Sequence, residues 1–250
     1  MIHLAAYLNA AAIVGSNPNF LKGVTDAMLA QDSAGNFLLP TDLKLIAAAY
    51  FDGSPKNAYL KSPQLNKISP RYIMPIVGAL LPGSRPGIQI ETMNPFQFTA
   101  QEYLSAYVNT ALSVAGTVAV GVWLGDGIVP SPGGQVYEVH ATPSSATTAD
   151  VWSTVQYSFD QALPSGNYAM VGASVVSANG LLARWKFGMT GNRPGYPCLN
   201  SVSNIASELD RLGLLGVIGV FPNTNQPFLE VLSTAAETPT DIFMRLLKIS

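Results

Sequence analysis

Charged side chains are scarce in this sequence. Asp, Glu, Lys and Arg make up 11% of its 250 residues, against about 25% in an average soluble protein. A folded monomer of this mass exposes on the order of 10,000 Å² of surface, so these charges are thinly spread. Three situations remove the need for charge: contact with lipid, contact with other protein copies, or a secreted surface of Ser, Thr, Asn and Gln.

Long apolar runs and basic clusters are also missing. The longest nearly uncharged runs, 4–14, 112–124 and 212–221, fall short of the roughly 18–20 residues that a membrane-spanning helix needs. No basic segment precedes the first run, so it makes a poor signal peptide. A net charge of −2 without a basic cluster argues against nucleic-acid binding by a charged arm.

Cysteine and histidine are almost absent. The single Cys198 excludes an internal disulfide framework, and two histidines leave no spaced ligand set for a metal. A nucleophilic site would have to combine His140 with Asp126, Asp150 or Cys198, and no catalytic motif surrounds these residues. We therefore expect that the protein is not an enzyme and needs no cofactor or metal.

The clearest pattern that is present is an alternation of apolar and polar residues between Val151 and Gly188. It predicts strands at 151–159, 168–178 and 181–187. Asn179-Gly180, between the last two strands, favours a type I′ hairpin turn, because both central positions of that turn need positive φ. We predict that the three strands form a consecutive β-meander.

Further strands and turns follow the same composition rules. Strands are expected at 114–124 (buried on both sides), 135–141, 214–221, 228–233 and 242–249. Seven or eight strands with short helical connections are typical of a mainly β, antiparallel two-sheet sandwich, with the jelly roll as one standard solution. We assign this jelly-roll-like domain to residues 96–250.

The N-terminal region, 1–95, has a different character. Alanine-rich and capped segments predict helices at 3–14, 21–29 and 41–50, and a Thr99–Glu102 capping box and Ser203 predict two more at 101–110 and 203–212. Seven prolines from Pro55 to Pro95 predict an extended limb that lies along a surface. Pro95 is the predicted domain boundary.

The pattern G-x-R-P-G occurs twice, at Gly83–Gly87 and at Gly191–Gly195. Pro-Gly favours a type II turn with glycine at the positive-φ position. The two copies are either similar turns by chance or rigid loops that present Arg85 and Arg193 to carboxylates or carbonyls of a neighbouring subunit. Arg85 and Arg193 are therefore our candidates for inter-subunit contacts.

Three segments, Leu163–Gly172, Leu181–Phe187 and Gly191–Gly195, together resemble jelly-roll major capsid proteins of tailless icosahedral bacteriophages and related uncultured viruses. The similarity covers roughly residues 110–250 and is one of general pattern. It implies a shell subunit that closes into pentamers, hexamers or pseudo-hexamers. The basic N-terminal arm of many capsid proteins is missing, which implies that an inner membrane, another virion protein or a neutral wall faces the genome.

The first hypothesis for function is therefore a structural virion protein that assembles with copies of itself into a capsid. An alternative is a secreted or surface β-sandwich that binds carbohydrate or a protein partner, which predicts exposed aromatic residues in the loops 143–149 or 188–201. A further alternative is a hydrolase on the same fold, which predicts that His140 and a carboxylate meet in a cleft.

Overall fold

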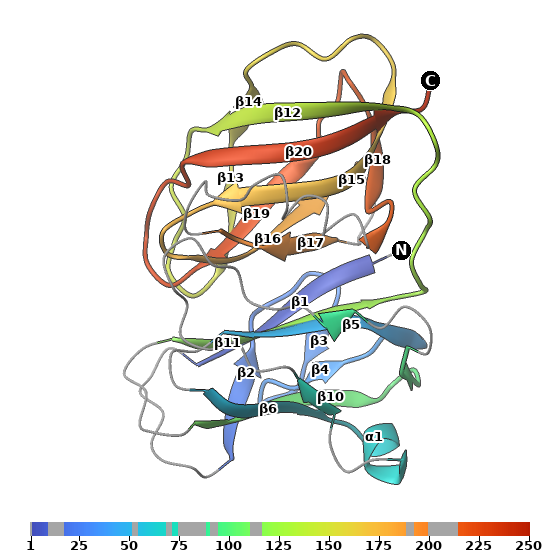
Figure 1. The fold of residues 1–250 in the computed structure, drawn as a ribbon. Helices are drawn as coiled ribbons and strands as arrows, with labels where there is room; N and C mark the ends of the chain where they lie inside the picture. Colours follow the sequence, from blue (N-terminus) through green and yellow to red (C-terminus); the bar gives the residue numbers. More distant parts are fainter. Residues whose placement is uncertain are drawn as a thin grey trace. The chain divides into compact units, whose positions relative to one another are not determined.

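The structure is a computed structural model of the chain. It describes residues 2–9, 18–51, 55–68, 72–74, 89–90, 95–110, 117–188, 193–199 and 215–250 (Figure 1). The described residues form two compact units. We call Ile2–Leu4 together with the chain from Gly127 onward the C-terminal unit, and the chain from Ala5 to Asp126 the N-terminal unit. Pro95 lies inside the N-terminal unit, and the chain passes from one unit to the other after Asp126.

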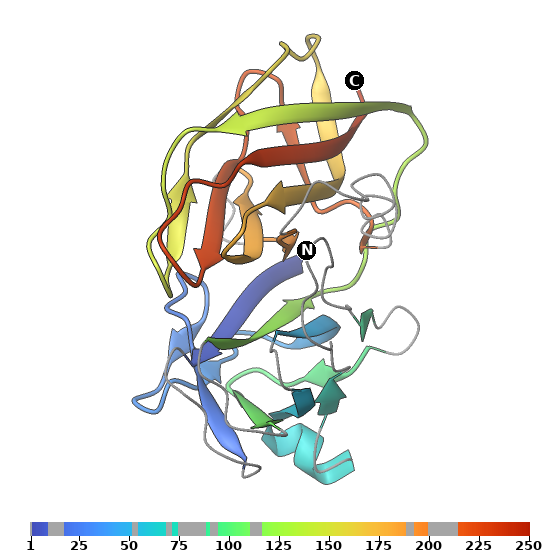
Figure 2. The ribbon, with the colours of Figure 1, turned by 60° about the vertical axis from the view of Figure 1, so that its left-hand side comes forward.

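The C-terminal unit contains two antiparallel sheets. The five-stranded sheet has the order β14-β12-β20-β15-β18, and the four-stranded sheet has the order β13-β19-β16-β17. β12 and β20 lie side by side in both views (Figure 1 and Figure 2). The strands are β12 (Gln135–Pro143), β13 (Trp152–Val155), β14 (Tyr157–Phe159), β15 (Asn167–Val176), β16 (Gly180–Lys186), β17 (Gly195–Pro197), β18 (Gly219–Pro222), β19 (Phe228–Ser233) and β20 (Asp241–Lys248).

The N-terminal unit is built from two rows of strands. One row has the order β1-β11-β5-β8 and the other β2-β10-β6-β7, joined through pairing of β1 with β2. The described elements are β1 (Ile2–Asn9, in this unit from Ala5), β2 (Asn19–Gly23), β3 (Ala30–Gln31), β4 (Phe37–Leu38), β5 (Leu43–Phe51), β6 (Pro55–Lys61), α1 (Pro63–Ile68), β7 (Tyr72–Met74), β8 (Gln89–Ile90), β9 (Gln97–Phe98), β10 (Tyr103–Thr110) and β11 (Val118–Gly125).

The two units share one strand order. In each unit, eight strands taken in chain order occupy the positions first-eighth-third-sixth in one row and second-seventh-fourth-fifth in the other. In the C-terminal unit these eight are β12, β13 and β15 to β20; in the N-terminal unit they are β1, β2, β5 to β8, β10 and β11. The chain thus repeats one winding pattern, although its two halves show no repeat of sequence beyond the short G-x-R-P-G element.

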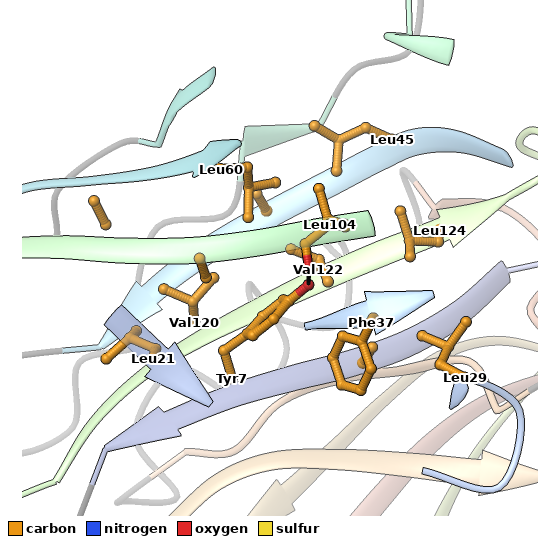
Figure 3. Packing of buried hydrophobic residues seen from close by; sticks show 14 of the residues in the cluster. Tyr7, Leu21, Leu29, Phe37, Leu45, Leu60, Leu104, Val120, Val122 and Leu124 are labelled. Atoms are coloured by element: carbon orange, nitrogen blue, oxygen red, sulfur yellow. Dashed lines mark hydrogen bonds between the residues drawn. The ribbon is translucent and has the colours of Figure 1, made fainter. Parts of the chain in front are cut away.

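The core of the N-terminal unit lies between its two rows. Alternate residues of β11 and β10, such as Val120, Val122 and Leu104, are fully buried in one cluster with Tyr7 and Phe37 (Figure 3). The Tyr7 hydroxyl donates a hydrogen bond of 2.6 Å to the carbonyl oxygen of Leu104, and burial raises the pKa of Tyr7. This bond satisfies the polar atom that Tyr7 places in the apolar cluster.

The predicted strands of the C-terminal half are confirmed. The segments expected at 228–233, 242–249, 135–141 and 181–187 coincide closely with β19, β20, β12 and β16. β11 is buried at every position, as its unbroken apolar run predicts. The strand expected at 214–221 is shorter, because β18 begins at Gly219.

The prediction of helices in the N-terminal region is wrong. The segments 3–14, 21–29 and 41–50 contain the strands β1, β2 and β5 where they are described. β11 lies between β1 and β5 and pairs with both. The backbone hydrogen bonds and the burial that it provides override the helix propensity of the alanines. The helix expected at 203–212 lies outside the described residues.

The Thr99–Glu102 capping box forms only in part. The Glu102 carboxylate accepts a hydrogen bond of 3.1 Å from the backbone N–H of Thr99, as the motif requires. Gln101, however, has φ of 65°, which ends any helical path. The chain therefore leaves the turn as β10, and the helix predicted at 101–110 is wrong.

The β-meander is also wrong. The single strand expected at 151–159 is divided into β13, in the four-stranded sheet, and β14, in the five-stranded sheet. β15 belongs to the five-stranded sheet and β16 to the four-stranded sheet, so the two are not hairpin partners. Gly180 does not have positive φ. A Cβ at this position would collide with the side chain of Ser177, so glycine is needed here for close approach.

The proline-rich limb is partly packed inside its own unit. β6 pairs along its length with β10, and Ala58 and Leu60 are fully buried in the core. The prediction of an extended limb that lies along a surface is therefore wrong for Ala58–Leu60. Most of 69–94 lies outside the described residues. Among the helices of the described chain, none is long and apolar enough to cross a membrane.

We predict that Tyr7→Phe lowers the free energy of unfolding by about 1–2 kcal/mol, because the buried carbonyl of Leu104 loses its donor. Urea unfolding followed by circular dichroism measures this change. Tyr103→Phe is the matched control, because Tyr103 is 45% exposed at the start of β10, the strand that carries Leu104. Equal stability of the two variants would contradict the structural role of the Tyr7 bond.

Candidate functional site

The strand pairing of the five-stranded sheet brings one histidine and two aspartates together. His140 on β12 lies directly opposite Phe243 on β20, and Asp241 begins that strand. On the other side of β12, Ala141 pairs with Phe159 of β14, which places Asp160 beside His140. The backbone N–H of Asp160 donates a hydrogen bond of 3.2 Å to the carbonyl of His140. Three strands therefore contribute to this site, which we call the histidine cluster (His140, Asp160, Asp241).

Each ring nitrogen of His140 contacts one carboxylate. Nδ1 is in a short contact with Asp160 Oδ2, and Nε2 lies 2.9 Å from Asp241 Oδ1. The Thr142 hydroxyl donates a hydrogen bond of 2.9 Å to the other carboxylate oxygen of Asp160. The imidazole also packs against the ring of Phe243, with 4.8 Å between centroids. The ring is thus fixed on both edges and on one face.

This arrangement stabilises the charged form of the imidazole. The hydrogen bond to Asp160 raises the pKa of His140, with a smaller contribution from Asp241 and against partial burial, which lowers it. In return, the hydrogen bond from His140, together with that from Thr142, lowers the pKa of Asp160. Only the imidazolium has N–H groups on both nitrogens, so only this form can donate to both carboxylates at once.

Each ring nitrogen of His140 is therefore occupied by a carboxylate of the same sheet, and neither is open to accept a proton from a nucleophile. The partners of His140 are Asp160 and Asp241, rather than Asp126, Asp150 or Cys198, the candidates expected from the sequence. A cavity of about 210 Å³ adjoins the cluster and is lined by Glu138, Val139, His140, Asp160 and Gln161. Within the described chain, no three His, Cys, Asp or Glu side chains are grouped to hold a metal ion.

A second charged group is buried in the same unit. Arg184 Nε donates a hydrogen bond of 2.7 Å to Glu230 Oε2, directly across the β16–β19 pair. Its Nη1 donates to the carbonyl of Leu4 at 3.0 Å, and its guanidinium lies 3.9 Å from the ring centroid of Trp152. Arg193 Nε lies 3.1 Å from the same Glu230 oxygen. We call Arg184, Arg193 and Glu230 the arginine pair network.

Arg193 also holds the first residues of the chain through its backbone. Its carbonyl accepts a hydrogen bond of 2.8 Å from the N–H of Leu4, and its N–H donates to His3 Nδ1 at 3.1 Å. Its side chain is buried and has an ion-pair partner inside the chain. Contact of Arg193 with another copy stays a prediction, and Arg85 lies outside the described residues.

The turn chemistry expected for the second G-x-R-P-G element is wrong at Gly195. This glycine does not have positive φ. It lies opposite Arg184 in the β16–β17 pair, where a Cβ would collide with the backbone of Ala183. Close approach of two strands therefore requires glycine next to the arginine pair network.

The sequence contains a signal for the arginine pair network, although the expectations above did not include it. Arg184 lies between alanine and tryptophan, and Glu230 between leucine and valine, each within a predicted buried strand. A charged residue inside an apolar strand needs a partner of opposite sign. Asp160 and Asp241 carry no such signal, because both lie at strand ends where aspartate is common.

Comparisons with known proteins show little similarity. No protein-family model matches the sequence, and no curated protein matches it. Solved structures with weak similarity include the major capsid protein P2 from bacteriophage PM2, at 11% identity and a TM-score of 0.25, covering 100% of this chain and 98% of that chain. A Paenibacillus xanthan lyase has the same identity and TM-score, covering 97% of this chain and 25% of that chain. Similarity at this level places the chain in neither family.

We predict that Glu230→Gln lowers the free energy of unfolding by about 3–5 kcal/mol, because two buried guanidinium groups lose their shared carboxylate. Chemical denaturation measures the change. Glu138→Gln is the matched control: Glu138 pairs with Arg245 on the sheet surface and is 59% exposed, so its loss costs about 0–1 kcal/mol. A Glu230→Gln effect no larger than that of the control would disprove this role of the network.

Proposed function

We propose that this protein is a self-assembling structural subunit of a virion shell. The observation that carries the proposal is the strand order. Two facing sheets in which eight strands occupy positions 1-8-3-6 and 2-7-4-5 form a jelly roll, the sandwich used by viral capsid and lectin domains. We interpret each unit of this chain as one such jelly roll.

The surface of the five-stranded sheet supports assembly. Val136, Leu247, Ala169 and Val220 lie directly opposite one another on β12, β20, β15 and β18, which places them on one face. Leu247 and Ala169 are buried with Val171, whereas Val136 and Val220 are each 50% exposed. We call Val136, Leu247, Ala169 and Val220 the apolar row. In a chain with 11% charged residues, such a row suits contact with another copy, because burying these side chains leaves no charged group without a partner.

The number of units per chain bears on the symmetry of the assembly. Because each chain contains two units of the same strand order, a ring of three chains contains six such units. A closed ring of three copies is therefore the pseudo-hexamer that tiles a shell, with cyclic symmetry and heterologous contacts. We propose this trimer as the capsomer and the virion as the location of the protein.

Of the two alternative functions, the carbohydrate-binding sandwich lacks the feature that it predicts, whereas the hydrolase has its predicted feature only in part. A carbohydrate-binding sandwich predicts exposed aromatic residues in the loops 143–149 and 188–201. The first loop contains no aromatic residue, and Tyr196 in the second is fully buried. A hydrolase predicts a histidine that meets a carboxylate in a cleft. His140 does meet carboxylates beside a cavity, but both of its nitrogens are occupied.

We predict that the purified protein sediments as a species of three times the 26.4 kDa chain mass, or as larger closed particles built from it. Sedimentation velocity at several concentrations and salt levels, with negative-stain images of the same sample, tests this. A monomer of 26.4 kDa under all conditions would rule out the assembly proposal.

We further predict that Val136→Asp combined with Val220→Asp shifts the protein toward the monomer, because two carboxylates would be buried in the contact. The circular-dichroism spectrum should stay that of the wild type, since both side chains are half exposed. Val151→Asp is the control, because Val151 is 45% exposed and directly precedes β13 of the four-stranded sheet. Loss of assembly in the control alone would place the contact elsewhere.

A further inference from the structure

β14 is a weakly held edge strand. It lies at the end of the five-stranded sheet, and among the described strands it pairs with β12 alone. The pairing has three residue pairs, and one of them, Pro143 with Tyr157, involves a proline without an N–H group. A backbone ladder this short contributes little, so the side chains at its ends decide whether the strand stays in place.

The two ends of β14 are held in different ways. At its start, Tyr157 is buried, and its hydroxyl donates a hydrogen bond of 2.6 Å to the carbonyl of Pro227. At its other end, Phe159 and Ser158 are exposed or half-buried, and the carboxylate of Asp160 contacts His140 and Thr142. The first attachment is apolar and uncharged, whereas the second depends on an ion pair.

We propose that the histidine cluster is a pH-sensitive fastener that holds the end of β14, from Ser158 to Asp160, against β12 and releases it at alkaline pH. The geometry carries this proposal. A neutral imidazole has a single N–H, so His140 can then donate to one carboxylate only, and its other nitrogen presents a lone pair to the second carboxylate. Asp241 belongs to β20 in the interior of the sheet, so the freed group is Asp160 at the edge.

Other charged groups on this face do not replace the fastener. Glu138 on β12 and Arg245 on β20 pair with each other one row away. Phe243 of β20 and Ser174 of β15, in the row of His140, do not titrate in this range. When His140 loses its proton, its ring loses the positive charge that faces Asp160 and Asp241, and Arg245 is already paired with Glu138.

The direction of the pH effect follows from the two protonation states. Attachment of the histidine to the carboxylates raises its pKa in the folded protein above the ordinary value of 6.5. The contribution of the fastener is therefore complete below pH 6.5 and is lost as the pH rises through the raised value. On the acid side, the contribution fades as the pH falls below the ordinary aspartate value of 3.8, through the lowered pKa of Asp160.

Release has a structural consequence at the sheet edge. The hydrogen bond from the Asp160 N–H to the His140 carbonyl is lost, and the backbone of β12 beside it becomes an open edge. An open strand edge is a template for pairing with a strand from another chain. The release itself is a property of the folded subunit, so its test does not depend on the proposed shell function.

Residue-resolved amide exchange of the full chain tests the proposal. We expect the protection of the Ser158–Asp160 amides, relative to an unstructured peptide at the same pH, to fall roughly fivefold or more between about pH 5.5 and about pH 9. The amides of β13, the edge strand of the other sheet, should change little. Because the chain has two histidines, the ring signals that disappear in His140→Gln identify His140 in the NMR spectrum, and the pKa from their titration should exceed that of a free histidine.

Variants separate the fastener from ordinary strand packing. In His140→Gln, protection of Ser158–Asp160 should be low and independent of pH. Asp160→Asn keeps the size of the side chain and should lower the pKa of His140 as well as the pH response; it serves if the first variant folds poorly. Glu138→Gln should leave the pH response unchanged. Protection that does not change with pH in the wild type, or that falls equally in His140→Gln, would overturn the proposal.

Discussion

Pairing between strands that are distant in sequence is the constraint on which both units depend. β12 pairs with β20, β10 with β2 and β6, and β11 with β5, so each ladder closes a long stretch of chain. Consecutive strands such as β15 and β16 lie in different sheets, and their connections cross from one sheet to the other. The free energy of such pairings is gained only after the entropy of closing the loops has been lost. The last strand of each eight, β20 or β11, lies between two partners and completes its sheet.

Two groups of charged residues in the C-terminal unit link strands that are far apart in the sequence. The arginine pair network joins β16 and β19 through a shared carboxylate and holds the carbonyl of Leu4, which belongs to the same unit. The histidine cluster joins β14, β12 and β20 at the sheet surface. The two differ in one physical respect. The histidine cluster contains an imidazole, the side chain whose charge changes near neutral pH, whereas the arginine pair network contains none.

A repeated winding and a weakly charged surface support a structural role, and they do so independently of similarity to any known protein. Fold alone does not decide function, because jelly rolls carry capsid subunits, lectins and enzymes. For this chain we propose contact between copies, and the proposal is supported by the exposed parts of the apolar row and by the occupied ring nitrogens of His140.

The sequence by itself determined where most strands of the C-terminal unit lie, because alternation over 228–233 or 242–249 sets which face is buried before any partner is chosen. It also determined the low surface charge. Only the tertiary structure decided that the alanines of β1 and β5 are extended, since pairing with β11 outweighs helix propensity. It alone decided that His140 meets Asp160 and Asp241. A period-2 pattern specifies a face and its burial, but the partner of a strand depends on how the whole chain closes, and no local pattern records that.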